Sequence, residues 1–327
     1  MISAIVIGKD EGARLGACLQ SIADALGPLR HEVIYVDSRS RDDSLRIARE
    51  RGARCFLLED SETTAGLGRY VGAKEARGEY LLFLDGDMCL CPGFVQQAML
   101  AMTSRGYDGV TGQREDVYLR DGEVVSRTPN YFGCTSERLA PEFGGALFIR
   151  ADALERCGGW SPDTIACEEA ELHARLLSAA CRIGELPVPM IVHTDAVRDG
   201  RGLLGVLLSR RRLGEGQAMR CAMAQGKGRA YLRREREKFL FYAFDWLCLL
   251  LFIAAIALLS LRGGAGSGGA ILSGALLACA CFIQAAQLGF LLARRRVRAF
   301  VSQKLFFFAF PAGLLTYKRR SRAYRAA

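Results

Sequence analysis

The chain has 327 residues, of which 50% are hydrophobic and 24% are charged, so it has room for one large α/β domain of about 200–250 residues and a smaller second region. Its formal net charge is +9, but residues 1–200 hold 22 Lys or Arg against 31 Asp or Glu, whereas residues 201–327 hold 22 against 4. This asymmetry excludes a uniform soluble domain, because the two parts must face different surroundings.

The first 85 residues alternate between strand-like and helix-like segments. Strands are predicted over 2–7, 31–36, 54–58 and 79–84, with helices between them over 13–25, 44–51 and 66–76. Because parallel strands need crossover helices, this order predicts a doubly wound α/β sheet. Ligands of such sheets bind beyond the carboxyl ends of the strands. Asp10, Asp37 and Asp85 each follow a predicted strand, so we expect them at one crevice.

After about residue 110 the pattern becomes mixed. Residues 111–125 predict antiparallel strands with a turn at Asp121-Gly122. Further strands are predicted over 145–149 and 187–193, and helices over 151–157 and 168–180. We therefore expect a cytosolic domain with a mixed sheet over residues 1–225.

Two apolar segments dominate the basic C-terminal part. Residues 239–261 contain one charge, Asp245, and residues 269–293 contain none; each is long enough to cross a hydrocarbon core of about 30 Å as a helix. Basic clusters precede the first segment and follow the second, which predicts that both outer flanks are cytoplasmic. Residues 226–327 are thus expected to anchor the protein in the inner membrane through a helical hairpin, and the basic charge indicates a bilayer rather than nucleic acid.

A third apolar stretch, residues 299–317, is harder to assign. It contains Gln303, Lys304 and Pro311, and it has basic residues at both ends. Positive charge on both sides favours an interfacial or re-entrant helix on the cytoplasmic face. A third membrane span is the alternative.

The most specific local motif is Leu82-Phe83-Leu84-Asp85-Gly86-Asp87. A predicted buried strand ends there in two carboxylates one residue apart. Carboxylates are the usual ligands of Mg²⁺ and Mn²⁺, and such an ion bridges diphosphate oxygens. The alternative is a solvated acidic turn.

Four blocks, in order, resemble the glycosyltransferases of family 2, which have the GT-A fold. The blocks read IVIGKDEGARLGACLQSI, VIYVDSRSRDDSLRIA, GLGRYVGAKEARGEYLLFLDGDM and GGALFIRADALERCGGWSPDTIACEEAELHARL, and they span roughly residues 2–200. The resemblance implies an inverting enzyme that uses a nucleotide-sugar, most simply a UDP-sugar. It also implies that Asp10 and Asp37 contact the nucleotide, with Asp37 at the base.

The same resemblance assigns roles to the remaining site residues. Arg69 matches a basic residue near the diphosphate, Asp85 lies near the ribose and the metal, and Asp87 binds the metal. Glu169 falls where the family has its catalytic Asp, as the base that deprotonates the acceptor hydroxyl. Glu168 is the alternative base, and an acidic first turn that complements the helix dipole is the structural alternative for both.

Three further residues are candidates with open alternatives. Trp160 is expected either to stack on an acceptor sugar or to lie in the core. His193 is expected to contact the metal or the diphosphate, or to be structural. Arg212, with its neighbours Arg210 and Arg211, is expected to bind the diphosphate or to face anionic lipid.

Together these features predict a metal-dependent transferase on the cytoplasmic face of the membrane. Its acceptor is expected to be membrane-associated, such as a polyprenyl-linked sugar in polysaccharide or glycolipid synthesis. The alternatives are a nucleotidyltransferase, and an inactive membrane scaffold with a transferase-like domain.

Overall fold

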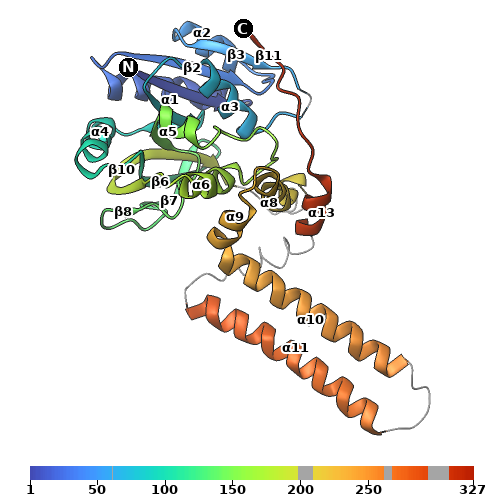
Figure 1. Ribbon diagram of the computed structural model, residues 1–327. Coiled ribbons are helices and arrows are strands. Elements are labelled where there is room, and N and C mark those ends of the chain that lie inside the picture. The colour runs from blue at the N-terminus through green and yellow to red at the C-terminus, as the bar shows by residue number, and fades with distance from the viewer. Residues whose placement is uncertain (61, 198–208, 261–266, 294–308) are drawn as a thin grey trace.

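The computed structural model describes residues 1–327 except 61, 198–208, 261–266 and 294–308. An α/β domain is joined to a long two-helix extension (Figure 1). The strands are β1 (Ile2–Gly8), β2 (His31–Asp37), β3 (Arg54–Leu58), β4 (Tyr80–Asp85), β5 (Met88–Leu90), β6 (Gly109–Arg120), β7 (Glu123–Thr128), β8 (Arg138–Leu139), β9 (Leu147–Arg150), β10 (Ile183–Ala196) and β11 (Tyr324–Ala326). The helices are α1 (Gly12–Leu26), α2 (Ser44–Glu50), α3 (Ala65–Glu75), α4 (Phe94–Arg105), α5 (Ala151–Arg156), α6 (Glu168–Ser178), η1 (Arg210–Leu213), α8 (Gly214–Ala224), α9 (Gly228–Arg234), α10 (Arg236–Ser260), α11 (Ser267–Ala293) and α13 (Ala309–Thr316).

The strands form one mixed sheet in the order β11-β3-β2-β1-β4-β9-β6-β10-β5. Strands β3, β2, β1 and β4 are parallel, as the alternation of strand and helix predicts. Strand β9 is antiparallel to both β4 and β6, and β6 forms the predicted antiparallel hairpin with β7 around residues 121–122. The predicted mixed α/β sheet is confirmed.

Helices cover both faces of the sheet because alternate side chains of each buried strand point to opposite sides. In β1, Ala4 and Val6 pack in a core with α1 and α4, whereas Ile5 and Ile7 pack in a second core with α3, α5 and α6. This three-layer arrangement leaves the carboxyl ends of the parallel strands uncovered by the helices that connect them.

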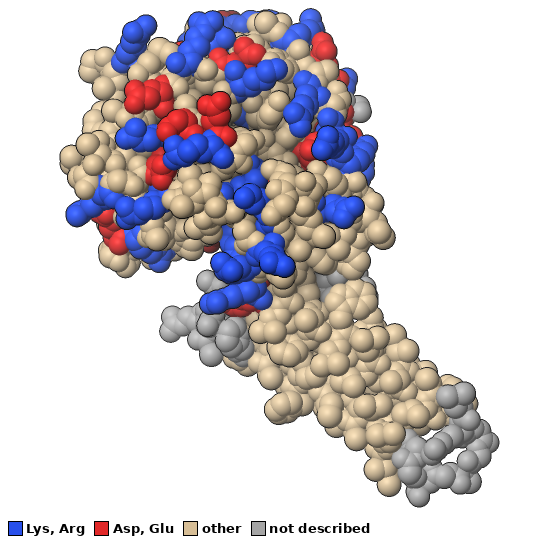
Figure 2. Space-filling view, viewed as in Figure 1, with Lys and Arg blue, Asp and Glu red and all other residues tan. Residues whose placement is uncertain are grey.

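The two predicted membrane segments form the helical hairpin α10–α11, which projects from the α/β domain (Figure 1). Their mean hydropathy is 2.3 and 1.8, and they are long and apolar enough to cross a membrane. Most of their side chains are exposed, unlike those of a buried core helix, and the visible face of the hairpin lacks the charges that cover the domain (Figure 2). The one charge predicted within the hairpin, Asp245, accepts a hydrogen bond from Gln284 of the facing helix at 3.1 Å.

Residues 309–316 of the predicted third segment form α13, and residues 299–308 lie outside the described part of the chain. Helix α13 crosses α8 closely, since a Cβ on Gly216 would lie 2.2 Å from the carbonyl oxygen of Phe310. The Phe310 ring also lies 5.1 Å from that of Phe239 in α10, measured between centroids. Helix α13 therefore rests where the domain meets the hairpin.

The last residues of the chain return to the α/β domain. Strand β11 pairs antiparallel with β3 at the edge of the sheet, and Tyr324 donates a hydrogen bond to Glu75 at 2.6 Å. The sequence assigned residues 226–327 as a whole to the membrane-anchoring region, so this strand corrects the prediction for the C-terminal residues. The physical reason is that β3 is otherwise an edge strand with unpaired backbone groups.

A charge cluster around Glu62 connects this C-terminal segment to the domain. The carboxylate of Glu62 pairs with Arg210 at 2.6 Å, Arg320 at 3.0 Å and Lys318 at 3.2 Å. Its hydrogen bonds to Arg210 and Lys318 lower the pKa of Glu62 to about 2. Three segments that are distant in sequence therefore meet just before α3.

We predict opposite effects for two glycine substitutions in helices. In Gly72→Ala, the new Cβ would lie 2.3 Å from Cγ2 of Ile5 in β1, so overpacking should destabilise the fold by about 1–3 kcal/mol. In Gly16→Ala the nearest atom is 3.9 Å away, so the loss of unfolded-state entropy should stabilise the fold by about 0.4–1 kcal/mol. Denaturant unfolding followed by circular dichroism measures both; equal effects would contradict the close packing of α3 on β1.

Candidate active site

Three parallel strands bring acidic residues to one edge of the sheet. Gly8 at the end of β1 is in register with Asp37 at the end of β2, and Ile7 is in register with Asp85 at the end of β4. Asp10 follows in the loop after β1. The three strand-end acids that the sequence singled out are thus delivered to the same edge.

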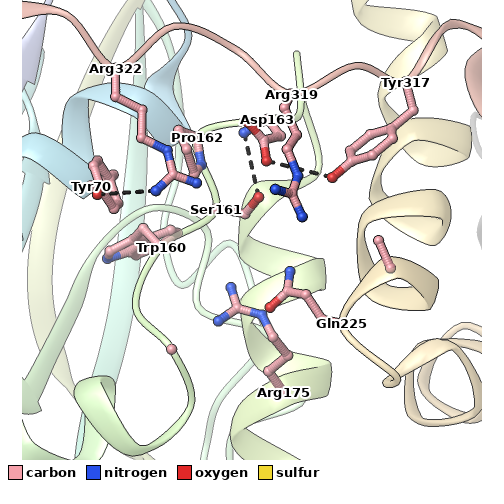
Figure 3. A pocket seen from close by; sticks show the side chains of 12 residues that line it. Tyr70, Trp160, Ser161, Pro162, Asp163, Arg175, Gln225, Tyr317, Arg319 and Arg322 are labelled. Atoms are coloured by element: carbon pink, nitrogen blue, oxygen red, sulfur yellow. Dashed lines mark hydrogen bonds between the residues drawn. The ribbon is translucent and has the colours of Figure 1, made fainter.

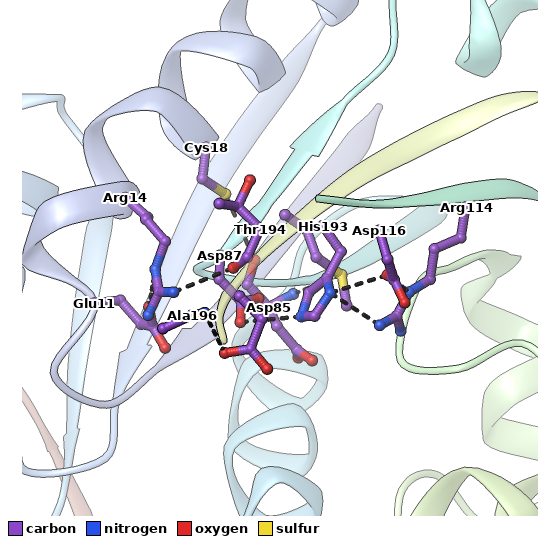
Figure 4. Close-up of polar contacts among 12 residues, drawn as sticks. Glu11, Arg14, Cys18, Asp85, Asp87, Arg114, Asp116, His193, Thr194 and Ala196 are labelled. Carbon is purple, nitrogen blue, oxygen red and sulfur yellow. Dashed lines mark hydrogen bonds and ion pairs between the residues drawn. The ribbon is translucent and has the colours of Figure 1, made fainter. Parts of the chain in front are cut away.

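Asp85 and Asp87 flank a tight turn between β4 and β5. The glycine between them donates its N–H to the carbonyl oxygen of Ile7 at 2.9 Å, which holds the turn against β1. The N–H of Thr194 in β10 donates to the carbonyl oxygen of Asp87 at 3.0 Å. This pairing brings His193 beside the turn, with its Nε2 atom 3.3 Å from Oδ2 of Asp87 (Figure 4).

The other side of the His193 ring faces Asp116 and Arg114 in β6. Its Nδ1 atom lies 3.0 Å from Oδ1 of Asp116 and 2.9 Å from Nη2 of Arg114. Burial by itself lowers the pKa of His193, but the hydrogen bond to Asp87 and the charges of Asp87 and Asp116 outweigh it, so the pKa is raised. A carboxylate behind Nδ1 directs Nε2 toward the turn, as is common for histidines that bind metals.

The residues around this turn fit a divalent cation that substrate helps to coordinate. Oδ1 of Asp87 is buried and has no hydrogen-bond partner among the described residues, which is unusual for a carboxylate oxygen. No group of three or more His, Cys, Asp or Glu side chains within the described part of the chain is placed to hold a metal by itself. Mg²⁺ is typically bound by one or two carboxylates together with waters and substrate phosphates, so the donor set is suited to such an ion.

A buried arginine binds the carboxylates behind the turn. Arg69 in α3 is 1% exposed, and its guanidinium contacts Asp85 and Glu168 at 2.8 Å each and Glu169 at 3.3 Å. It also stacks over the Trp160 ring at 5.0 Å. Sequence reasoning expected Arg69 beside a diphosphate; in the structure its two terminal nitrogens are paired with acids from β4 and α6.

Burial and mutual repulsion shift the titration of these acids. Desolvation, followed by the charge of Glu169, raises the pKa of Glu168 to about 7. Desolvation also raises the pKa of Asp85, although Arg69 opposes it. The side chain of Glu169 is 29% exposed, against 5% for Glu168, so Glu169 is the more accessible of the two.

The backbone beside this cluster is shaped to approach it closely. Helix α6 begins directly after Cys167, which has a left-handed φ of 64°, so that Glu168 and Glu169 lie in the first turn. Gly145, with φ of 86°, passes so close that a Cβ there would lie 2.7 Å from Nη2 of Arg69. A side chain at this position would displace the guanidinium from its carboxylate partners.

The predicted role of Trp160 as an acceptor platform is not supported. The Trp160 side chain is 1% exposed and packs edge-to-face against Phe83 and Phe143. The structure therefore places Trp160 in the core beneath Arg69, which is the alternative that the sequence left open. It is buried because it belongs to the core cluster that also contains Phe83 and Phe143.

The carboxylates of Asp10 and Asp37, which are predicted to contact the nucleotide, bind groups of β2 and of the loop after it in the structure. Asp37 is 1% exposed, and its carboxylate accepts hydrogen bonds from the Ser40 N–H at 2.8 Å and the Tyr35 hydroxyl at 3.2 Å. Asp10 accepts a hydrogen bond from the Arg41 N–H at 2.7 Å. Both acids thus shape the loop after β2.

A cavity of about 360 Å³ opens at the acidic turn. Its lining includes Asp85, Asp87, Thr63 and Arg211. The sequence assigned the basic contact to Arg212, but the neighbouring Arg211 lines the cavity. In the single turn of η1, consecutive side chains point about 120° apart, and sequence alone does not show which one faces the site.

Glu11 is a site residue that the sequence analysis missed. It lines the same cavity, pairs with Arg14 at 2.8 Å, and has its pKa raised by burial and by the charge of Asp87. Arg14 in turn donates to the carbonyl oxygen of Thr194 at 3.1 Å (Figure 4). The position of Glu11, directly after β1 and Asp10, is the feature of the sequence that could have indicated its place in the site.

Comparison with known proteins agrees with this geometry. Residues 3–156 match glycosyl transferase family 2. These residues, a little under half of the chain, are thus similar to the family 2 glycosyltransferases. The matched residues contain most of β1, the strands β2 to β4 and the Asp85–Asp87 turn.

Two relatives extend the comparison. A segment of 109 residues is 29% identical to 4,4'-diaponeurosporenoate glycosyltransferase of Staphylococcus haemolyticus, and it covers 32% of this chain and 28% of that protein's length. The crystal structure of S. aureus TarS 1–349 in complex with UDP-GlcNAc matches with a TM-score of 0.55 and 18% identity, over 98% of this chain and 93% of that one. The latter likeness shows that the two share a fold.

We predict that the pH dependence of stability reports the buried Glu168. Its pKa is about 7 in the folded protein and near the ordinary 4.5 when unfolded, so the folded state keeps a proton that the unfolded state loses. The free energy of unfolding should therefore fall as pH rises through this window. Thermal unfolding without nucleotide at about pH 5 and pH 8 should show a smaller fall in Glu168→Gln than in the wild type. The exposed Glu123→Gln variant is the control, and identical pH profiles for all three proteins would contradict the assignment.

Proposed function

We propose that this chain is an inverting, metal-dependent glycosyltransferase that moves a sugar from a nucleotide-sugar to a membrane-associated acceptor. The observation that carries the proposal is the convergence of the Asp85–Asp87 turn, His193 and the Arg69–Glu168–Glu169 cluster at one strand-end edge. The family 2 match over residues 3–156, which include Arg69 and the Asp85–Asp87 turn, supports this reaction class.

Two adjoining cavities suit a nucleotide-sugar donor. The cavity at the acidic turn shares Lys9 and Thr63 with a second cavity of about 690 Å³, which also includes Ser40 and Arg41. In our proposal the nucleoside occupies the second cavity, and the diphosphate and sugar occupy the first. Asp37 then acts by fixing the loop that forms the nucleoside cavity. We propose a UDP-sugar, since the similar TarS structure holds UDP-GlcNAc.

The chain's own residues would bind and neutralise the diphosphate. Asp87 would hold Mg²⁺ or Mn²⁺ through its unpartnered Oδ1, with His193 and Asp85 beside it. When bound, such an ion neutralises the charge that develops on the departing diphosphate. Arg211 lines the same cavity and is suited to a phosphate oxygen.

Glu169 is the residue that we propose as the general base. It is more exposed than Glu168, and Arg69 holds its carboxylate at 3.3 Å, so the oxygen that faces the site can accept the acceptor's hydroxyl proton. The resulting oxygen nucleophile attacks the anomeric carbon on the side opposite to the diphosphate, which inverts the configuration. Glu168, buried and with a raised pKa, fits the role of positioning Arg69 better.

The acceptor is proposed to reach the site from the bilayer. The α10–α11 hairpin is long and apolar enough to cross a membrane, and it leaves the domain beside α9 and α8 (Figure 1). A polyprenyl-linked sugar would present its hydroxyl near the membrane surface while its lipid stays in the bilayer. The basic residues at the domain end of the hairpin support a cytoplasmic location for the domain.

A nucleotide-sugar panel tests the proposed reaction. We expect the purified full chain to release a nucleoside diphosphate from one of the sugars in the presence of Mn²⁺, and more rapidly when membrane lipid extract is added as acceptor. Release of pyrophosphate would instead indicate a nucleotidyltransferase, and absence of any metal-dependent nucleotide binding would indicate a scaffold.

The proposed orientation in the membrane is tested with sealed vesicles. Inside-out vesicles should consume added donor, and right-side-out vesicles should not; the reverse would contradict the proposed orientation.

The metal role of Asp87 gives a specific prediction. Asp87→Asn should lose roughly a thousandfold in turnover, because the ion supplies several kcal/mol of charge stabilisation. It should also lose the stabilisation that Mn²⁺ and UDP together give in a thermal shift assay. The matched control is Asp24→Asn, an exposed acid on α1 that should leave both readouts unchanged. Full turnover in Asp87→Asn would disprove the metal role.

The two adjacent glutamates can be distinguished kinetically. Glu169→Gln should lower kcat by roughly 10²–10⁴-fold while donor binding is preserved, as expected for loss of a general base. Glu168→Gln keeps a hydrogen-bonding group beside Arg69 and should lose much less. Measuring kcat and the Kd for UDP in both variants decides the assignment; a larger kcat loss in Glu168→Gln would reverse it.

A further inference from the structure

A third cavity, separate from the two at the candidate active site, lies between α6, α8 and the segment that follows α13 (Figure 3). It encloses about 260 Å³ and shares no lining residue with the cavity at the acidic turn. Its lining includes Arg175, Arg319, Arg322, Tyr70 and Tyr317. Trp160 also lines it, so this ring separates the cavity from the Arg69 cluster.

The lining of the cavity carries a net positive charge, because it holds three arginines and one aspartate, and only Arg175 has an acidic partner of its own in the part of the chain that the structure describes. Asp163 is the one acidic residue in its described lining, and both of its carboxylate oxygens are engaged, by the N–H of Arg320 at 2.9 Å and the hydroxyl of Tyr317 at 3.5 Å. Arg175 is neutralised by Glu171, with Nη2 and Oε2 2.6 Å apart.

The two remaining arginines have no acidic partner among the described residues. Arg319 makes no hydrogen bond or ion pair with any described residue, and Figure 3 shows its guanidinium directed into the cavity. Arg322 stacks over the ring of Tyr70 at 5.0 Å and donates one hydrogen bond to its hydroxyl at 3.3 Å. Stacking fixes the guanidinium plane while most of its N–H donors stay available.

The cavity also lies close to the proposed membrane surface. Tyr317 directly follows α13, and Phe310 in α13 contacts Phe239 and Tyr242 at the start of α10. Helix α13 therefore connects the lining of the cavity to the base of the apolar hairpin. The volume is below the roughly 300–1,000 Å³ of pockets for drug-sized ligands, which suits a small headgroup.

We propose that this cavity is a binding site for a phosphate group, held by Arg319 and Arg322. Guanidinium groups bind phosphate through paired N–H donors, and basic pockets beside membrane helices bind anionic lipid headgroups. The phosphate belongs either to a lipid headgroup or to a soluble phosphate compound. The site is independent of the proposed transferase reaction, because it uses different residues and is tested by binding rather than turnover.

The test uses the full chain in neutral detergent and the double variant R319Q/R322Q. Inorganic phosphate, compared with chloride at equal ionic strength, should raise the thermal unfolding midpoint of the wild type. The double variant should bind phosphate roughly tenfold or more weakly, as expected for the loss of charge-assisted hydrogen bonds. R220Q removes the same kind of exposed charge on α8 outside the cavity and should behave as the wild type. The side chains of Arg319 and Arg322 are both exposed. The variant R319K/R322K keeps their positive charge, so comparison with it distinguishes weaker phosphate binding from an effect on folding.

A second arm identifies the source of the phosphate. The chain is reconstituted in phosphatidylcholine nanodiscs with and without phosphatidic acid. Stabilisation by phosphatidic acid that requires Arg319 and Arg322 and abolishes the response to inorganic phosphate supports a lipid headgroup. A response to inorganic phosphate alone, lost in the double variant, supports a soluble ligand. The proposal is overturned if the wild type responds to neither probe, or if the double variant responds as R220Q does.

Discussion

The buried guanidinium of Arg69 holds together the carboxylates on which the candidate site depends. Asp85 ends β4, and Glu168 and Glu169 begin α6, so their mutual repulsion would otherwise separate the strand from the helix. Removing one partner of such a buried cluster typically costs several kcal/mol, because a charge is left unpaired. Arg69 therefore serves the fold and the site together, and Gly145 must lack a side chain to allow it.

The chain also ties the segments on either side of the apolar hairpin to the wall of the cavity at the acidic turn. The carboxylate of Glu62 forms ion pairs with Arg210, Lys318 and Arg320. The next residue, Thr63, lines both the cavity at the acidic turn and the cavity that adjoins it. Strand β11 then fixes the C-terminal end on β3. The apolar hairpin α10–α11 is consequently held to the α/β domain by segments that lie before and after it in the sequence.

Much of the site followed from local sequence. The Asp85–Gly86–Asp87 turn, the α6 acids and the order of the parallel strands were predictable, because a strand-end acid on a parallel sheet has a fixed location. Other features were not. His193 comes beside Asp87 because β10 pairs with β5, where His193 is in register with Met88, 105 positions away in the sequence. Arg211 lines the cavity in place of Arg212 because of the rotation within one helical turn.

The sequence by itself determined the α/β alternation, the apolar hairpin and the acidic turn, because each depends on periodicity or on residues adjacent in the chain. Only the tertiary structure decided that Trp160 is buried, that Asp37 is bound by its own loop, and that the C-terminal residues complete the sheet. These outcomes depend on which segments far apart in sequence come into contact. Burial and pairing are properties of that packing, and a residue's type does not specify them.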